Sequence, residues 1–281
     1  PFAEGFDLAP TENNAGFVAF LDLVVERGRA VLSEVFLGFF PAIAGHGAYL
    51  ADLRSARRRI GRTQVSPPGE TPDRRTSMPS RMTDLFHDKA ADWDTRPFPL
   101  QISEGVSRAL DERVPLDATM TVLDFGAGTG LIAAKVAPAV KEILAVDVSA
   151  AMLEQLAKKP ELAGKVSVFC QDILEKPLGR TVDLIVSAMA MHHVQDTGAL
   201  AKTLFAHLAP GGRVALADLD VEEGDFHPPG AEGVFHAGFD RGKLGGLLTE
   251  AGFADVAFTT ACEVTKEGKR YPIFLVTATR R

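Results

Sequence analysis

From residue 121 onward, short apolar runs alternate with longer amphipathic stretches along the chain. Short runs bounded by glycine and polar residues predict buried strands, whereas stretches with apolar positions three or four residues apart predict helices. Strands that alternate with helices in this way are typical of an α/β fold in which helices cover a mostly parallel, doubly wound sheet. The seven predicted strands are residues 121–125, 142–147, 166–170, 182–189, 213–219, 255–260 and 271–277.

Local residue types predict where several helices begin and end. Ser149 is an N-cap residue ahead of one helix, Thr197 begins another, and a third opens at 239–240 and ends at Gly252. Residues 210–212, a Pro-Gly-Gly sequence, stop a helix and turn the chain before the fifth strand. Two further helices are predicted at 84–94 and 99–114, where they would lie over the ligand-binding edge of the sheet.

The last two predicted strands have no helical pattern between them. Residues 263–270 are polar and include Gly268, so we expect a loop here and an antiparallel hairpin of the two strands. Because a dinucleotide-binding domain is commonly all parallel, this ending favours a different branch of the doubly wound folds.

The first 81 residues differ in composition from the rest of the chain. They contain ten Arg and no Lys and carry net charge +1, whereas residues 82–281 contain nine Arg and eleven Lys and carry −8. Apolar positions at helical spacing predict a partly helical N-terminal extension over 1–81, and the proline-containing polar stretch at about 63–81 predicts a disordered linker. A domain boundary is therefore predicted at residue 82. The arginine cluster at 54–62 is interpreted as a solvated helix end, with an arm for nucleic acid or an anionic membrane as the alternative.

Composition and charge narrow the classes of partner. The 281 residues are 46% hydrophobic and 24% charged, and their net charge of −7 provides no basic field to hold nucleic acid. Two separate cysteines, Cys170 and Cys262, predict neither a disulfide framework nor a metal site, so a cytoplasmic location is expected. The apolar stretch at 30–51 is interrupted by Glu34 and Pro41, which predicts a helical segment and no stable membrane insertion. The oligomeric state is left open.

A glycine-rich loop follows the first predicted strand. Gly126, Gly128 and Gly130 allow a tight turn and a close approach of the main chain to a ligand, where free backbone N–H groups begin a helix. Such a loop serves several nucleotide cofactors. The dinucleotide pattern needs a further glycine at the position of Leu131, so NAD is disfavoured. Helix packing is the alternative role for Gly130.

Acidic residues accompany the first three strands at nucleoside-binding spacing. Asp147 ends the second strand and can accept hydrogen bonds from two ribose hydroxyls, and Asp172, after the third strand, can accept one from an adenine amino group. Asp124 adds a carboxylate near the cationic end of the ligand. A helix N-cap or a solvated loop is the alternative role for Asp147 and Asp172.

Several motifs in order resemble those of the class I S-adenosylmethionine-dependent methyltransferases. They lie at residues 122–130 (VLDFGAGTG), 146–153 (VDVSAAML), 171–172 (QD) and 208–212 (LAPGG), and the resemblance covers about residues 82–281. It implies a Rossmann-like fold with S-adenosylmethionine as cofactor: Gly126 and Gly128 line its methionine portion, Asp147 the ribose, and Met152 and Asp172 the adenine. The predicted cofactor site comprises Asp124, Gly126, Ala127, Gly128, Gly130, Asp147, Val148, Met152, Gln171, Asp172, Ile173, Ala188 and Trp93.

The segment at 86–94 resembles the N-terminal lid helix of the small-molecule branch of this family, a broad group that includes quinone-biosynthesis methyltransferases. The resemblance implies that Phe86 and Trp93 shield the cofactor.

Histidines follow the fourth and fifth strands, where an acceptor pocket is expected. Methyl transfer from a sulfonium is an in-line displacement, so the protein must align the acceptor and exclude water, and a base is needed only where the acceptor loses a proton. His192, His193 and His236 are the candidate catalytic or acceptor-side residues. As the alternative, the first two rings bond to backbone or pack beside the cofactor. His227 lies beside two prolines, where a surface turn is the alternative to catalysis.

The segment after the fourth strand lacks the motifs of base-methylating relatives. Residues 187–193 read SAMAMHH, with neither an Asn/Asp-Pro-Pro-aromatic motif nor a catalytic cysteine. A metal site at His192, His193 and Asp196 is not expected, because neighbouring residues on an extended chain point apart. We therefore predict an enzyme that methylates an O, N or C atom of a small-molecule acceptor. The alternatives are a protein methyltransferase, a non-catalytic S-adenosylmethionine-binding module and an NAD(P)-dependent oxidoreductase.

Overall fold

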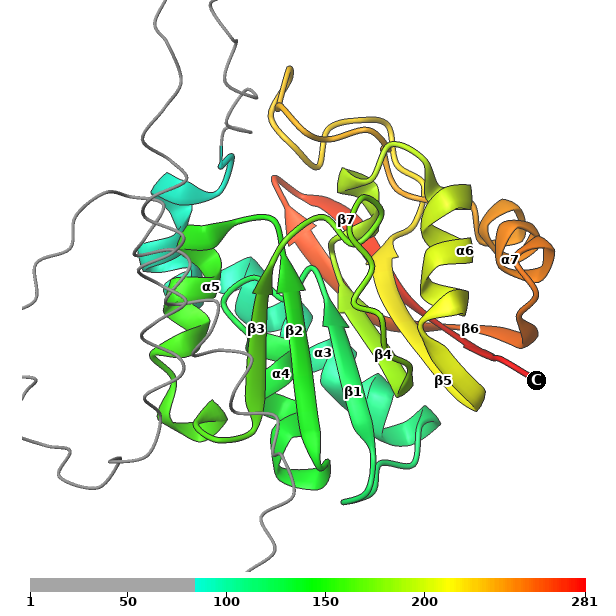
Figure 1. Cartoon of the computed structure of the whole chain (residues 1–281). Helices are drawn as coiled ribbons and strands as arrows, with labels where there is room; N and C mark the ends of the chain where they lie inside the picture. Colours follow the sequence, from blue (N-terminus) through cyan, green and yellow to red (C-terminus); the bar gives the residue numbers. More distant parts are fainter. Residues whose placement is uncertain (1–83) are drawn as a thin grey trace, which may run out of the picture. The chain divides into compact units, whose positions relative to one another are not determined.

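Seven strands form one sheet in the computed structural model, which describes residues 84–281 (Figure 1). Their order in space is β3-β2-β1-β4-β5-β7-β6; the first five pair in parallel, and β7 runs antiparallel to both β5 and β6. The predicted Rossmann-like sheet with an antiparallel C-terminal hairpin is therefore confirmed. The extension predicted over residues 1–81 lies outside the described residues. The strands are β1 Thr121–Phe125, β2 Glu142–Asp147, β3 Val166–Cys170, β4 Val182–Ala188, β5 Leu208–Leu219, β6 Ala254–Lys266 and β7 Lys269–Thr279.

Helices cover both faces of this sheet. In β1, Val122 faces the core cluster that contains α3, α4 and α5, whereas Leu123 and Phe125 face the cluster that contains α6 and α7. The alternation follows from the two-residue period of a strand. The helices are α3 Pro97–Arg113, α4 Leu131–Val136, α5 Ala150–Ala157, α6 Thr197–Ala206 and α7 Arg241–Glu250, and the short 3-10 segments are η2 His87–Thr95, η3 Ala137–Ala139, η4 Pro160–Leu162 and η5 Met191–His193.

The predicted helix starts are confirmed by their caps. The Ser149 side chain accepts a hydrogen bond from the Met152 N–H at the start of α5, and Asp240 caps α7 in the same way. Asp196 caps α6, which begins at Thr197 as expected. Each cap satisfies a backbone N–H that has no partner within its own helix.

The expected loop at 263–270 is wrong, because both strands of the hairpin continue through it. Val264 pairs with Tyr271 across the hairpin, and both are buried. Only Glu267 and Gly268 turn the chain, with positive φ angles of 54° and 81° that are typical of a tight two-residue turn. The polar neighbours on the solvent side of each strand hid this alternation in the sequence.

Other boundaries differ by a few residues. The strand expected at 182–189 ends at Ala188, because Met189 adopts a left-handed φ of 59°. The Pro-Gly-Gly turn at 210–212 belongs to β5, where it forms an irregularity in the pairing with β4. The helices expected at 84–94 and 99–114 are the 3-10 segment η2 and the helix α3.

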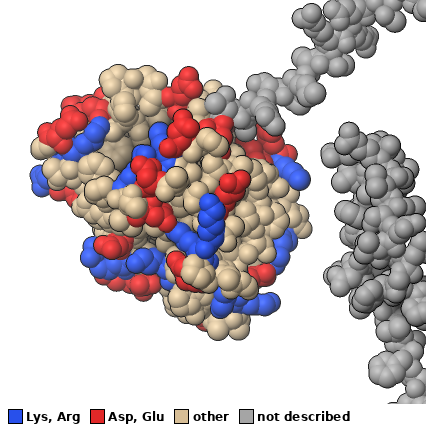
Figure 2. Space-filling model, turned by 90° about the vertical axis from the view of Figure 1, so that its left-hand side faces the viewer, with Lys and Arg blue, Asp and Glu red and all other residues tan. Residues whose placement is uncertain are grey.

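The described surface carries charges of both signs. Figure 2 shows acidic and basic side chains interspersed on the face that lies at the left of Figure 1. Among residues 84–281, no helix combines the length and the apolar character that crossing a membrane requires. The apolar stretch at 30–51 lies outside the described residues.

Candidate functional site

The glycine loop connects β1 to α4 through three left-handed residues. Gly126, Gly128 and Gly130 have φ angles of 66°, 53° and 82°. A Cβ atom on Gly126 would collide with Ala190 Cβ from the segment after β4, and one on Gly130 would lie 2.7 Å from Leu156 Cγ. A Cβ on Gly128 would meet no described heavy atom within 4 Å. Packing of protein against protein therefore requires the first and third glycines, whereas Gly128 borders open space.

Asp147, at the end of β2, holds this loop with its carboxylate. Its Oδ2 accepts a hydrogen bond from the Gly128 N–H at 2.7 Å, and its Oδ1 accepts one from the Ser149 N–H at 2.8 Å. Burial raises the pKa of this carboxyl, and the amide donors oppose that rise. Because each carboxylate oxygen has a second lone pair, Asp147 can still accept from ligand hydroxyls.

Asp124 lies inside the sheet, on the same face of β1 as Val122. It is 2% exposed, and its Oδ2 has no hydrogen-bond partner among the described residues. Desolvation, followed by the charge of Asp147, raises its pKa to about 7. A buried acceptor without a donor is unfavourable in a folded protein. This position therefore suits a cationic or hydrogen-bond-donating group of a ligand.

The predicted adenine side lies directly after β3. Asp172 Oδ1 accepts a hydrogen bond from the Leu174 N–H at 2.8 Å, and Gln171 Nε2 donates to the Lys176 carbonyl at 2.7 Å. Ile173 is 1% exposed and belongs to the core. This loop is thus shaped by its own hydrogen bonds, and the adenine role of Asp172 stays a prediction.

Three more predicted cofactor residues lie at strand ends. Ala127 donates its N–H to the Val146 carbonyl at 3.1 Å, Val148 is 52% exposed, and Ala188 is the last residue of β4. The structure brings them to one edge of the sheet because β1 lies between β2 and β4 and all three strands are parallel.

The segment η2 lies against α5 at the same edge. The rings of Phe86 and Trp93 meet edge-to-face with centroids 5.9 Å apart, and both pack against a small buried cluster that includes Met152. Just before η2, Asp84 Oδ2 accepts a hydrogen bond from the Ala151 N–H at 3.2 Å. The predicted lid segment therefore covers the start of α5, and shielding of the cofactor stays a prediction.

Asp94 ties η2 to the glycine loop. Its Oδ1 accepts a hydrogen bond from Thr129 Oγ1, and its Oδ2 pairs with Lys159 Nζ at 2.6 Å. Asp84 and Asp94 could not be singled out from the sequence, because single acids in a segment of mixed charge have no distinctive spacing.

A buried histidine and a buried carboxylate meet where β4 and β5 end. His192, in η5, is 1% exposed, and its Nδ1 lies 2.7 Å from Oδ1 of Asp218, which is 0% exposed. The two Asp218 oxygens also accept the N–H groups of His192 and Leu219, at 3.2 and 2.8 Å. On the other side of the ring, His192 Nε2 lies 3.2 Å from His227 Nε2. The structure thus joins His192 to two residues that the sequence did not pair with it.

His193 and His236 bond to backbone carbonyls instead. His193 Nδ1 lies 2.7 Å from the Gly233 carbonyl, and burial is the main cause that lowers its pKa to about 4. Its ring packs beside His192, with centroids 4.1 Å apart. His236 Nε2 lies 2.9 Å from the Val194 carbonyl, so the His236 ring is bonded to backbone and not to the rings of His192 and His193. Within residues 84–281, no group of three or more His, Cys, Asp or Glu side chains is placed to hold a metal ion.

The connection from residue 221 to 238, which forms an arm, closes over η5. The N–H groups of Phe235 and His236 donate to the His192 carbonyl at 3.0 and 3.3 Å. A hollow of about 340 Å³ lies within the arm, and Glu222 and His227 are among its lining residues. The arm therefore places His227 against His192, which is bonded in turn to Asp218.

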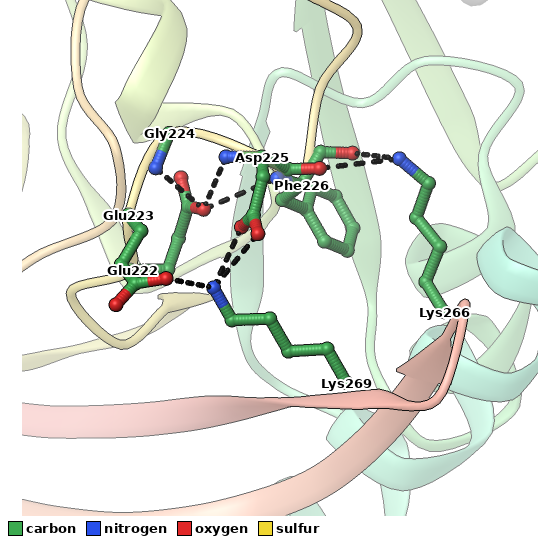
Figure 3. Close-up of polar contacts among 7 residues, drawn as sticks. All are labelled: Glu222, Glu223, Gly224, Asp225, Phe226, Lys266 and Lys269. Carbon is green, nitrogen blue, oxygen red and sulfur yellow. Dashed lines mark hydrogen bonds and ion pairs between the residues drawn. The ribbon is translucent and has the colours of Figure 1, made fainter.

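The tip of the β6–β7 hairpin holds the arm in place, as Figure 3 shows. Lys269 Nζ binds Asp225 at 2.8 Å and Glu223 at 2.9 Å. Lys266 Nζ donates to the carbonyls of Asp225 and Phe226 at 3.2 and 2.9 Å. Since the tight turn places these two lysines side by side, the hairpin fixes the residue that precedes His227.

A family model described as a methyltransferase domain matches residues 97–257, which is more than half of the chain. The chain belongs to this methyltransferase family. The class I methyltransferase resemblance predicted from the motifs is thus confirmed, whereas the finer likeness to quinone-biosynthesis enzymes is not.

Curated relatives match over part of their length. An uncharacterized methyltransferase of Schizosaccharomyces pombe is 33% identical over 123 residues, which cover 39% of this chain and 43% of that protein. Trans-aconitate 2-methyltransferase of Methylobacterium radiotolerans is 33% identical over 165 residues, which cover 54% of this chain and 61% of that protein. The chain spans about half the length of the curated relatives it matches.

Solved structures show the same fold. N-methyltransferase NodS of Bradyrhizobium japonicum, in complex with S-adenosyl-L-homocysteine, has a TM-score of 0.54 at 20% identity and covers 72% of this chain and 96% of that one. A SAM-dependent methyltransferase from Aquifex aeolicus has a TM-score of 0.53 at 25% identity and covers 69% of this chain and 98% of that one.

Proposed function

We propose that this chain is an S-adenosylmethionine-dependent methyltransferase that transfers the methyl group, in line, to an O, N or C atom of a small-molecule acceptor. The main support for this proposal comes from the glycine loop. Gly128 borders open space and donates its N–H to Asp147, and Asp124 nearby has a buried oxygen without a hydrogen-bond partner within residues 84–281. The solved relative NodS, of the same fold, is in complex with the demethylated product of this cofactor.

The two acids would bind two different parts of this cofactor. Asp147 has lone pairs for ribose hydroxyls, and Oδ2 of Asp124 would accept a hydrogen bond from the ammonium group of the methionine portion. Met152 and Asp172 would border the adenine. S-adenosylmethionine supplies a methyl group on a positively charged sulfur, so the protein needs no covalent intermediate.

The acceptor side would lie where β4 and β5 end. The arm closes over η5 and would exclude water from the reacting atoms, while the neutral imidazole of His193 would add no positive charge beside the sulfonium. The net charge of −8 on residues 82–281 favours a small molecule over nucleic acid as the acceptor. We also propose the cytoplasm as the location.

Calorimetry tests the cofactor side. S-adenosylmethionine and S-adenosylhomocysteine are expected to bind, and NAD is not. Asp147→Ala should weaken S-adenosylmethionine binding by about tenfold or more, because hydrogen bonds to a charged group contribute about 1.5–3 kcal/mol each. Glu154→Ala, at an exposed position on α5, is the matched control and should bind normally. Binding of NAD alone, or unchanged affinity in Asp147→Ala, would contradict the proposal.

A radiolabelled-methyl screen tests the acceptor. Phenols, amines, quinone precursors and carboxylic acids form the panel, and the name of the Methylobacterium relative supports including tricarboxylic acids. We expect label in at least one small molecule. Label in macromolecules alone would contradict the small-molecule proposal, and no transfer despite normal cofactor binding would favour a binding module.

We further propose that residues 82–281 form the methyltransferase domain and that residues 1–81 are a separate extension. A fragment of residues 82–281 should bind S-adenosylmethionine as the full chain does. Loss of binding in that fragment would refute the boundary.

A further inference from the structure

Three polar side chains from three separate elements form one hydrogen-bonded chain on the acceptor side. Asp218 comes from β5, His192 from η5 and His227 from the arm. The Asp218 Oδ1 to His192 Nδ1 distance is 2.7 Å, and the His192 Nε2 to His227 Nε2 distance is 3.2 Å. The Asp218 and His192 side chains are buried and the His227 side chain is half-buried. This series of hydrogen bonds therefore leads from the core to the hollow in the arm.

The hydrogen-bond partners determine which ring nitrogens carry protons. Both oxygens of Asp218 accept backbone N–H groups, so they act as acceptors and His192 Nδ1 donates. Neutral His192 then has a lone pair on Nε2, and His227 Nε2 must be the donor in the bond between the rings. This leaves the lone pair of His227 on Nδ1, for which the structure shows no hydrogen bond within residues 84–281.

The surroundings keep His227 unprotonated at neutral pH. Burial, followed by the nearby His192 and His193, lowers the pKa of His227 to about 4, and Lys89 from η2 acts in the same direction. Asp218 opposes this shift. A positive charge is thus disfavoured on the His227 ring, whereas the His192 ring lies 2.7 Å from the Asp218 carboxylate, which provides a counter-charge for an imidazolium.

The geometry points to a proton relay from His227 to His192, with the Asp218 carboxylate as the counter-ion, that deprotonates the methyl acceptor, which therefore bears an O–H or N–H group at the methylated atom. This inference rests on the proposed methyl transfer. The acceptor oxygen or nitrogen forms the bond to the methyl carbon, and the carbon–sulfur bond breaks with its electron pair going to sulfur. The acceptor proton goes to His227 Nδ1, and the Nε2 proton of His227 goes to His192 Nε2. The reaction leaves an imidazolium at His192 beside the Asp218 carboxylate.

The hairpin tip explains how His227 is held for this role. Lys266 binds the carbonyl of Phe226, and the Phe226 ring packs edge-to-face on Tyr271 and on His227, with centroids 5.2 and 5.1 Å apart. In Figure 3 both lysines reach from the hairpin to the stretch of the arm just before His227. A ring fixed by its preceding residue keeps its Nε2 aligned with His192.

Nitrogen NMR of the full chain, labelled at histidine, tests the relay without any acceptor. At neutral pH we expect His227 with its proton on Nε2 and His192 with its proton on Nδ1. When acid adds one proton, His192 should become doubly protonated and His227 should switch to the Nδ1–H form. Asp218→Asn should abolish the switch, and His87→Gln, an exposed control, should retain it. A proton on His227 Nδ1 at neutral pH, or a doubly protonated His227 beside a neutral His192, would overturn the inference.

Kinetics test the acceptor class on a substrate found in the radiolabelled screen. His227→Gln should lower kcat about 10²- to 10⁴-fold for phenol or N–H acceptors, the range typical of general base catalysis, with KM nearly unchanged. The loss in kcat should shrink at high pH, where a phenol or a protonated amine loses its proton to the solvent. Normal kcat in His227→Gln with such an acceptor would overturn the relay. Failure of S-adenosylmethionine to bind the wild type would instead overturn the proposed function and leave the NMR result standing.

Discussion

Gly126→Ala is expected to destabilise the fold through two separable causes. The first is its φ of 66°, since a left-handed backbone costs a residue with a Cβ atom about 1–2 kcal/mol. The second is the collision of the new Cβ with Ala190 Cβ, for which overpacking data indicate about 1–3 kcal/mol. Together they predict a loss of about 2–5 kcal/mol, a large part of the 5–15 kcal/mol that holds typical domains folded.

A double-mutant cycle separates the two causes. Ala190→Gly removes the atom that collides, so the free energy of unfolding of the double variant should recover the overpacking part and keep the φ part. Urea unfolding of the wild type, both single variants and the double variant gives the coupling energy, expected at about 1–3 kcal/mol. Additivity of the two substitutions within about 0.5 kcal/mol would refute the contact between the glycine loop and the segment after β4.

Gly128→Ala is the matched control. It has a similar φ of 53°, but its Cβ would enter open space. Its free energy of unfolding should therefore fall by only about 1–2 kcal/mol, while S-adenosylmethionine affinity falls because the methyl group intrudes on the space proposed for the cofactor. If Gly128→Ala destabilised the fold as much as Gly126→Ala and left cofactor affinity normal, Gly128 would serve protein packing and would not border the cofactor.

Three further variants test charges around the site. Burial raises the pKa of Asp124 from 3.8 to about 7, so its stabilising contribution is full below pH 3.8 and is lost as pH rises through about 7. In urea unfolding, Asp124→Asn should remove this dependence of the free energy of unfolding on pH. The same pH dependence in the wild type and the variant would contradict the prediction. The pKa of His193 is lowered from 6.5 to about 4, so stability should fall as pH drops through this range, and His193→Gln should flatten that acid limb; an unchanged limb would exclude His193 as its source. Replacing Lys266 and Lys269 by Met should speed amide hydrogen exchange in residues 222–226 with little change in Tm, because exposed ion pairs contribute about 0–1 kcal/mol each. Arg270→Met on the same hairpin is the control, and equal exchange in both variants would show that the lysines do not hold the arm.

The sheet was predictable because its signal is local. The inner parallel strands β1, β2 and β4 are mostly buried on both faces, so each is a short apolar run, as at 142–147 and 182–188. The hairpin extension at 263–270 was not predictable in the same way. Its buried residues Val264 and Tyr271 are separated by polar residues, and their pairing depends on a two-residue turn at Glu267 and Gly268 that only the backbone reveals.

The site likewise has one part that could be predicted from the sequence and one part that could not. The cofactor edge follows from spacing, since Asp124 is the last but one residue of β1, Asp147 ends the neighbouring strand β2, and parallel strands place their carboxyl ends together. The hydrogen-bonded residues Asp218, His192 and His227 come from three elements, and no characteristic spacing in the sequence links them. One signal for them was present: Asp218 interrupts an apolar strand, and a carboxylate in such a position needs a buried partner.

The short segment after β4 couples the two halves of the site. Met189 adopts a left-handed φ of 59°, which is unfavourable for a residue with a side chain and persists only where surrounding contacts hold it. Those contacts lie on both sides, because Ala190 packs over Gly126 and His192, two residues later, bonds to Asp218. The glycine loop and the histidine chain thus constrain one strained turn, so a shift of the loop must be accommodated between Ala190 and His192. Because of this connection, the proposed methyl donor site and the proposed proton relay are parts of one packed unit.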